Sequence, residues 1–127
     1  MDFGTSFGWN LLIISCLDTC WLTINFKCWP NVIYPSNITS KPLPVIILCS
    51  LVCWIVSALY LAGHQYDTEL KSLVEGAWTG ALVYSVFNFT TIIMNKEWTI
   101  PAMLADIIWG TSLYAIASIL TFKLGGM

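Results

Sequence analysis

The sequence predicts an all-α integral membrane protein with four transmembrane helices in an antiparallel bundle. Of its 127 residues, 57% are hydrophobic and only 9% are charged, whereas a soluble domain carries about 25% charged residues. Four apolar windows each reach the roughly 20 residues that a helix needs to cross a bilayer. The windows lack the polar alternation of a transmembrane barrel, and open strands would leave backbone groups unpaired in lipid. The whole chain therefore forms one membrane domain.

The first predicted span covers residues 7–28 and carries Asp18 in its middle. The second covers residues 43–63 and contains no charged residue. Between them, residues 29–42 are rich in Pro, Asn and Ser, which is the composition of a loop.

The third predicted span covers residues 72–94 and follows a charged connection at residues 63–71. A short turn at residues 95–99 leads into the fourth span, residues 100–123, which carries Asp106 inside an apolar run. Four spans place both termini on one side of the membrane. Several tryptophans fall near predicted span ends, where an amphipathic indole prefers to lie: Trp9, Trp29, Trp78 and Trp98.

Polar side chains are expected to meet inside the bundle. Asp18, Asn88 and Asp106 fall within about one helical turn of each other in depth. An aspartate at the centre of a bilayer costs about 2.5 to 3.5 kcal/mol, so such residues are usually functional or paired. Each acid is followed three residues later by a tryptophan, Trp21 or Trp109. The sequence thus predicts one polar binding cluster that contains all five residues.

Small residues predict the seam along which helices pack. Gly76 and Gly80 are four residues apart in the third span, a spacing that lets another helix approach closely. Gly110 shares a face of the fourth span with Asp106. We expect these three glycines to be helix-packing residues.

Several function classes are disfavoured. The net charge is −2 without a Lys or Arg cluster, which argues against nucleic-acid binding. No nucleophile–base pair or metalloprotease motif is apparent, so we expect neither an enzyme nor a cofactor. Cysteines four residues apart on the first two spans make a four-thiolate metal site conceivable. Cysteine is also a common small apolar residue, and we expect no metal. These cysteines are Cys16, Cys20, Cys49 and Cys53.

The stretch EGAWTGALVYSVFNFTTIIMNKEWTIPAMLADIIWGTSLYAIAS, residues 75–118, resembles the family called domain of unknown function 2177. That family consists of small predicted four-span membrane proteins of bacteria and some large DNA viruses. The first D-x-x-W stretch, from Asp18 to Trp21, is also similar to the family's opening motif. The resemblance implies the four-span fold and a membrane location, but no activity. The residues that occupy the family's pattern are Gly76, Gly80, Asn88, Trp98, Asp106, Trp109 and Gly110.

Two function classes remain open from the sequence. The favoured one is a non-enzymatic structural or assembly component of a cellular or virion membrane, in contact with lipid and with copies of itself or other membrane or coat proteins. The alternative is a small-solute, ion or proton binding and transport protein that uses Asp18 and Asp106. A chain of 127 residues leaves little room for a complete transport path, which favours the first.

Overall fold

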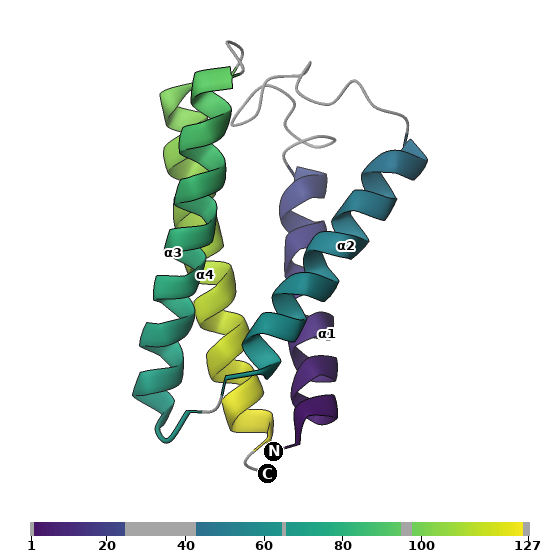
Figure 1. The fold of residues 1–127 in the computed structure, drawn as a ribbon, viewed down its shortest axis with the longest axis vertical. Coiled ribbons are helices and arrows are strands. Elements are labelled where there is room, and N and C mark those ends of the chain that lie inside the picture. Colours follow the sequence, from purple (N-terminus) through teal and green to yellow (C-terminus); the bar gives the residue numbers. More distant parts are fainter. Residues whose placement is uncertain (1, 25–42, 65, 95–97, 126–127) are drawn as a thin grey trace.

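The computed structural model describes residues 2–24, 43–64, 66–94 and 98–125. Within these residues the chain is all-helical, which confirms the predicted fold class at that level (Figure 1). The predicted first span extends to residue 28, and its last part lies outside the described residues. The helices are α1 (Phe3–Thr23), α2 (Leu43–Ala62), α3 (Glu69–Met94) and α4 (Ile100–Gly125).

Side-chain caps explain why α1 and α3 begin earlier than the apolar windows predict. The Asp2 carboxylate accepts a 2.7 Å hydrogen bond from the backbone N–H of Thr5. Hydrogen bonding by Thr5 also lowers the pKa of this carboxyl. At the start of α3, the hydroxyl of Thr68 accepts a 3.1 Å hydrogen bond from the N–H of Lys71. Such caps satisfy N–H groups that have no partner within the first helical turn, so polar residues can open an apolar helix.

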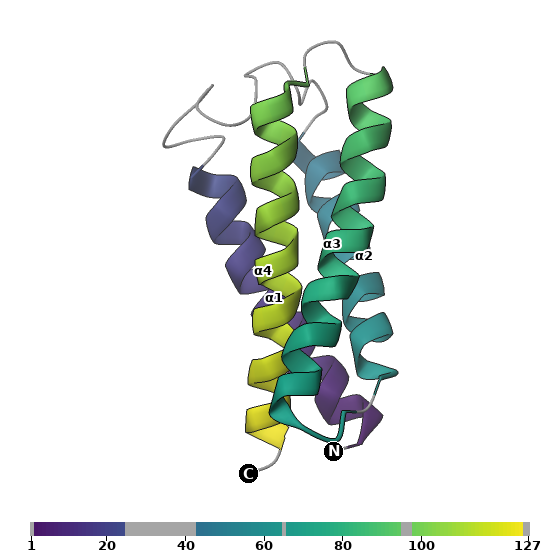
Figure 2. The same ribbon diagram turned by 90° about the vertical axis from the view of Figure 1, so that its left-hand side faces the viewer.

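The helices pack as two pairs that share one further contact. α3 packs against α4, α1 packs against α2, and α1 also packs against α4, whereas α2 and α3 scarcely touch. Figure 2 shows α3 and α4 running side by side along most of their length. In Figure 1, α2 is inclined, with its lower end beside α4 and its upper end turned away. Both termini lie at the same end of the bundle.

Glycines bring α3 and α4 into close contact. A Cβ atom on Gly76 would lie 2.6 Å from the backbone oxygen of Tyr114. A Cβ on Gly80 would collide with the backbone oxygen of Gly110, and a Cβ on Gly110 with the ring of Tyr84. No side chain larger than hydrogen fits at these points without moving the backbone or the ring. The seam therefore depends on the absence of these side chains.

The buried apolar core lies where α1, α2 and α4 converge. It contains Ile14, Leu61, Leu113, Tyr114 and Ala117. A second cluster, at the beginning of α4, contains Trp98, Ala102 and Met103.

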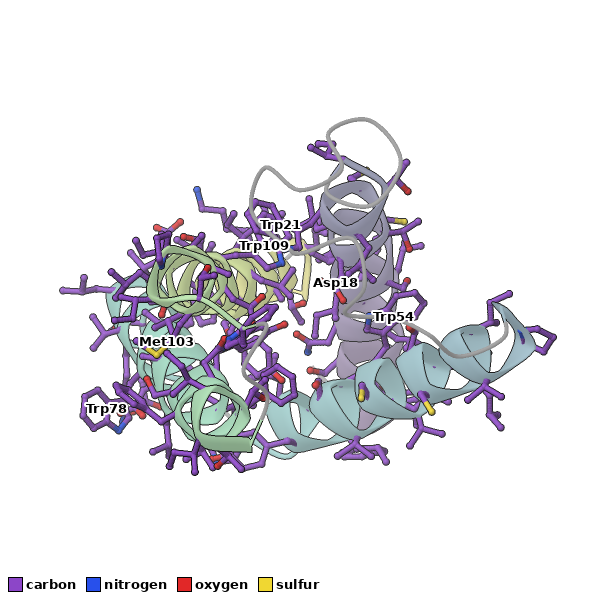
Figure 3. All side chains as sticks on the ribbon, turned by 90° about the horizontal axis from the view of Figure 1, so that it is seen from above. Asp18, Trp21, Trp54, Trp78, Met103 and Trp109 are labelled. Carbon is purple, nitrogen blue, oxygen red and sulfur yellow. The ribbon has the colours of Figure 1, made fainter. Side chains whose placement is uncertain are left out.

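Large apolar side chains cover the outside of α2 and α3. Trp78, for example, is 69% exposed and points away from the bundle (Figure 3). Judged by length and composition, one helix among the described residues can cross a membrane, namely Ile100–Leu124. The stretch Ile47–Ala62 is apolar but shorter.

Candidate functional site

Asp18 on α1 is hydrogen-bonded to both neighbouring helices. Its Oδ2 accepts a 2.8 Å hydrogen bond from the indole N–H of Trp54 on α2. Its Oδ1 accepts a 3.1 Å hydrogen bond from the indole N–H of Trp109 on α4. Figure 3 shows the three side chains converging between their helices. Asp18 as a whole remains partly exposed at this junction.

Helical periodicity directs these side chains inward. Asp18 follows the core residue Ile14 by four positions and therefore lies on the same face of α1. On α2, Trp54 precedes the buried Ala58 and Leu61 by four and seven positions. The faces of α1 and α2 that bury the apolar core thus also carry Asp18 and Trp54. Asp18 lies about one turn after Ile14, and Trp54 lies about one turn before Ala58.

One aromatic pair lies beside this carboxylate, and a second lies in the adjoining apolar core. Trp21 stacks on Trp109 with the ring centroids 4.8 Å apart and the planes at 5°. Tyr84 and Tyr114 meet edge to face with their centroids 6.2 Å apart. The Tyr114 hydroxyl shares a 2.5 Å hydrogen bond with that of Ser57 on α2. The ring of Tyr84 lies against Gly110 in the α3/α4 seam. We call Asp18, Trp54 and Trp109, with the ring of Trp21, the Asp18 site.

Asp106 lies in a separate and fully closed environment. Asn88 on α3 donates a 2.8 Å hydrogen bond from Nδ2 to Asp106 Oδ2 on α4, and another of 2.8 Å to the backbone oxygen of Tyr84. The indole N–H of Trp98 donates to Asn88 Oδ1 at 3.0 Å. Asn88 is 0% exposed and Asp106 is 6% exposed. We call these two side chains the Asn88–Asp106 pair. It joins α3 to α4 deep inside their seam.

The predicted polar cluster is therefore divided into two sites. Asn88 and Asp106 meet as the depth argument expects, and Trp21 and Trp109 stack on each other. Asp18 takes its hydrogen bonds from Trp54 and Trp109 rather than from the other two polar residues. Equal depth does not suffice for contact here, because Asp18 belongs to the α1/α2 pair and the other two residues lie inside the α3/α4 seam.

Sequence reasoning missed two tryptophan donors. Trp98 was expected at the membrane surface, but it is 5% exposed and bonded to Asn88. The position of Trp54 in the sequence could have indicated its role as a donor. It lies in the middle of a span without charges, where an indole N–H needs an acceptor from another helix.

The cysteines do not assemble a metal site within the described part of the chain. Cys16 and Cys20 on α1 are exposed, as are Cys49 and Cys53 on α2. The described residues contain no group of three or more His, Cys, Asp or Glu side chains placed to hold a metal ion. Cys28 lies outside the described residues.

Comparison with known proteins gives the chain a family. No curated protein and no solved structure matches it. One protein family, described as "Predicted membrane protein (DUF2177)", matches residues 3–123, which is nearly the whole chain. The match includes both D-x-x-W stretches and the glycines of the α3/α4 seam, and agrees with the resemblance seen in the sequence. The chain belongs to this family of predicted membrane proteins.

Proposed function

We propose that the chain is a multi-pass membrane protein that binds a small polar solute or ion at Asp18, between its two helix pairs, and catalyses no reaction. The observation that carries the proposal is the position of Asp18, a partly exposed residue whose carboxylate lies at the junction of α1, α2 and α4. Asp106 has a structural role in this account, because its carboxylate is closed inside the α3/α4 seam.

The Asp18 carboxylate has acceptor capacity left for a ligand. An ionised carboxylate offers about four acceptor positions. The indoles of Trp54 and Trp109 fill one on each oxygen. About two positions remain, and Asp18 itself is partly exposed. A ligand can therefore bind to Asp18 without displacing either indole.

The packing of the helices supports access to this residue. The apolar core of Ile14, Leu61 and Leu113 closes the bundle on the side of the termini. Beyond it, α2 turns away from α3 and α4 (Figure 1). The Asp18 site lies about one helical turn beyond this core, at the contact of α1 with α2 and α4. A solute would enter between the α1/α2 pair and the α3/α4 pair rather than between the two helices of one pair.

The second candidate is the structural or assembly role that the sequence favours. One observation supports it: the Asp18 carboxylate bonds α1 to α2 and α4, and the Asn88–Asp106 pair bonds α3 to α4. On this hypothesis both acids serve only to hold the helices together. The two hypotheses differ in whether Asp18 is available to a reagent.

Modification by dicyclohexylcarbodiimide tests the proposal. This membrane-soluble reagent attacks protonated carboxyl groups in apolar surroundings, and peptide mass spectrometry locates the product. We expect Asp18 to be modified and Asp106 to stay unmodified in the full chain reconstituted in lipid nanodiscs. Asp18→Asn should lose the modification, whereas Asp106→Asn should retain it at Asp18. An unreactive Asp18 would contradict the binding proposal and support the structural one.

A further inference from the structure

We propose that the ligand of the Asp18 site is an organic ammonium cation, either an amine or a quaternary ammonium group. This inference rests on the proposed function and names its ligand class. It depends on three properties of the site: the charge of Asp18, the neutral donors that hold it, and the aromatic rings beside it.

The charge of Asp18 is not balanced by its hydrogen-bond partners. Both donors are neutral indoles, from Trp54 and Trp109. The lysines among the described residues, Lys71 and Lys123, lie at the opposite end of the bundle, at the start of α3 and the end of α4. Lys123 is already paired with Glu69 at 2.8 Å. Because a buried charge is stabilised by an opposite charge, a cationic ligand complements this site.

The aromatic rings favour an organic cation. Ammonium groups are attracted to the faces of Trp and Tyr rings, and carbon substituents gain apolar contact there. Three such rings belong to the Asp18 site, those of Trp21, Trp54 and Trp109, and each of these side chains is partly exposed. Their aromatic carbon offers apolar contact beside the carboxylate. The carboxylate then selects the sign of the charge.

Other ligand classes fit the site less well. A hard metal ion needs about six oxygen ligands, whereas the groups nearest to Asp18 are two N–H donors and aromatic carbon. No set of three metal-ligating side chains occurs among the described residues. An anion would be repelled by the Asp18 carboxylate. A neutral solute would leave the carboxylate without an opposite charge.

The decisive experiment measures how ligands protect Asp18 from dicyclohexylcarbodiimide. The full chain is reconstituted in phosphatidylglycerol nanodiscs, whose lipids carry no ammonium group. The competitors are choline and its uncharged carbon analogue 3,3-dimethylbutanol, which has the same shape. We expect choline to slow the modification of Asp18 at least about tenfold and the alcohol to leave the rate unchanged. Equal rates with both compounds would overturn the ammonium proposal.

The design separates this inference from the function on which it rests. If Asp18 does not react in the absence of competitor, the binding proposal itself fails. If it reacts but choline does not protect it, binding at Asp18 stands and the ammonium class is wrong. Phosphatidylcholine nanodiscs identify the source of the cation. Protection by the lipid alone indicates a headgroup, whereas protection only by added choline indicates a free solute.

A ring substitution provides a second test that leaves Asp18 in place. Trp21→Leu removes the ring that stacks on Trp109, and Trp78→Leu is the matched control because Trp78 is exposed on the outside of α3. We expect Trp21→Leu to raise the Kd for choline about tenfold, measured by tryptophan fluorescence, and the control to leave it unchanged. Equal Kd values in both variants would overturn the role of the rings.

Discussion

Asp106 and Asp18 differ chiefly in what surrounds their carboxylates. Asp106 is 6% exposed and bonded to Asn88, which is itself completely buried. Asp18 is partly exposed and accepts hydrogen bonds from two indoles on different helices. A buried polar group that loses its partner keeps its desolvation cost, whereas an exposed one can turn to water. Residues of the same type therefore serve different purposes, stability for Asp106 and binding for Asp18.

Replacement of Asn88 tests the structural role of the Asn88–Asp106 pair. Asn88→Leu keeps the branching of the side chain but removes the hydrogen bonds that Asn88 makes with Trp98 and Asp106. We expect a loss of about 1–3 kcal/mol in the free energy of unfolding, measured by reversible denaturation in mixed micelles. Phe89→Leu is the control, since Phe89 is 55% exposed on the same helix. An equal change in the free energy of unfolding of both variants would contradict the structural role of the Asn88–Asp106 pair.

The sequence reveals part of the site, and particular residues show where it fails. Helical rise places Asn88 and Asp106 at one depth on neighbouring spans, which is enough to predict their meeting. The sequence does not predict Trp54 as a donor to Asp18, because the two residues are 36 positions apart and no local spacing relates them. The sequence does not predict the burial of Trp98, because a tryptophan at a span end fits the membrane surface equally well. Its inward orientation is known only from its hydrogen bond to Asn88 and its 5% exposure.

At the scale of the helix, the α3/α4 seam is the element most fully encoded in the sequence. Gly76 and Gly80 predict a close approach, and Gly110 identifies the face of α4 that receives it. The inclination of α2 is not predictable in the same way. Its residues are apolar on almost every side, so no stripe indicates which face packs or at what angle. The starts of α1 and α3 depend on the caps Asp2 and Thr68, which an apolar window overlooks.

Two alanine substitutions test the seam against a matched control. Gly80→Ala places a methyl group against the backbone of Gly110, which cannot move independently of α4. We expect a loss of about 1–3 kcal/mol in the free energy of unfolding. Gly8→Ala on α1 meets nothing within 4 Å. It should stabilise the protein by about 0.5–1 kcal/mol, since alanine favours a helix more than glycine does. A tolerated Gly80→Ala would contradict the close seam.

At the scale of the whole molecule, the closely packed α3/α4 pair and the less closely packed α1/α2 pair meet where α1 contacts α4. Glycines, the Asn88–Asp106 pair and the salt bridge from Lys123 to Glu69 hold α3 to α4. The α1/α2 pair contributes Asp18 and Trp54, and α2 leans away from the rest (Figure 1). This asymmetry places the candidate binding site between the pairs. It also makes the proposed function depend on four helices crossing one bilayer together.

Topology mapping shows whether four helices cross the bilayer. Single cysteines are introduced by Phe3→Cys, Asp67→Cys and Ile100→Cys into a chain whose native cysteines are replaced by serine or alanine. A membrane-impermeant maleimide is then applied to sealed vesicles. Four spans predict that positions 3 and 67 react from one side of the membrane and position 100 only from the other. Reaction of all three from the same side would contradict the four-span bundle and the membrane site at Asp18.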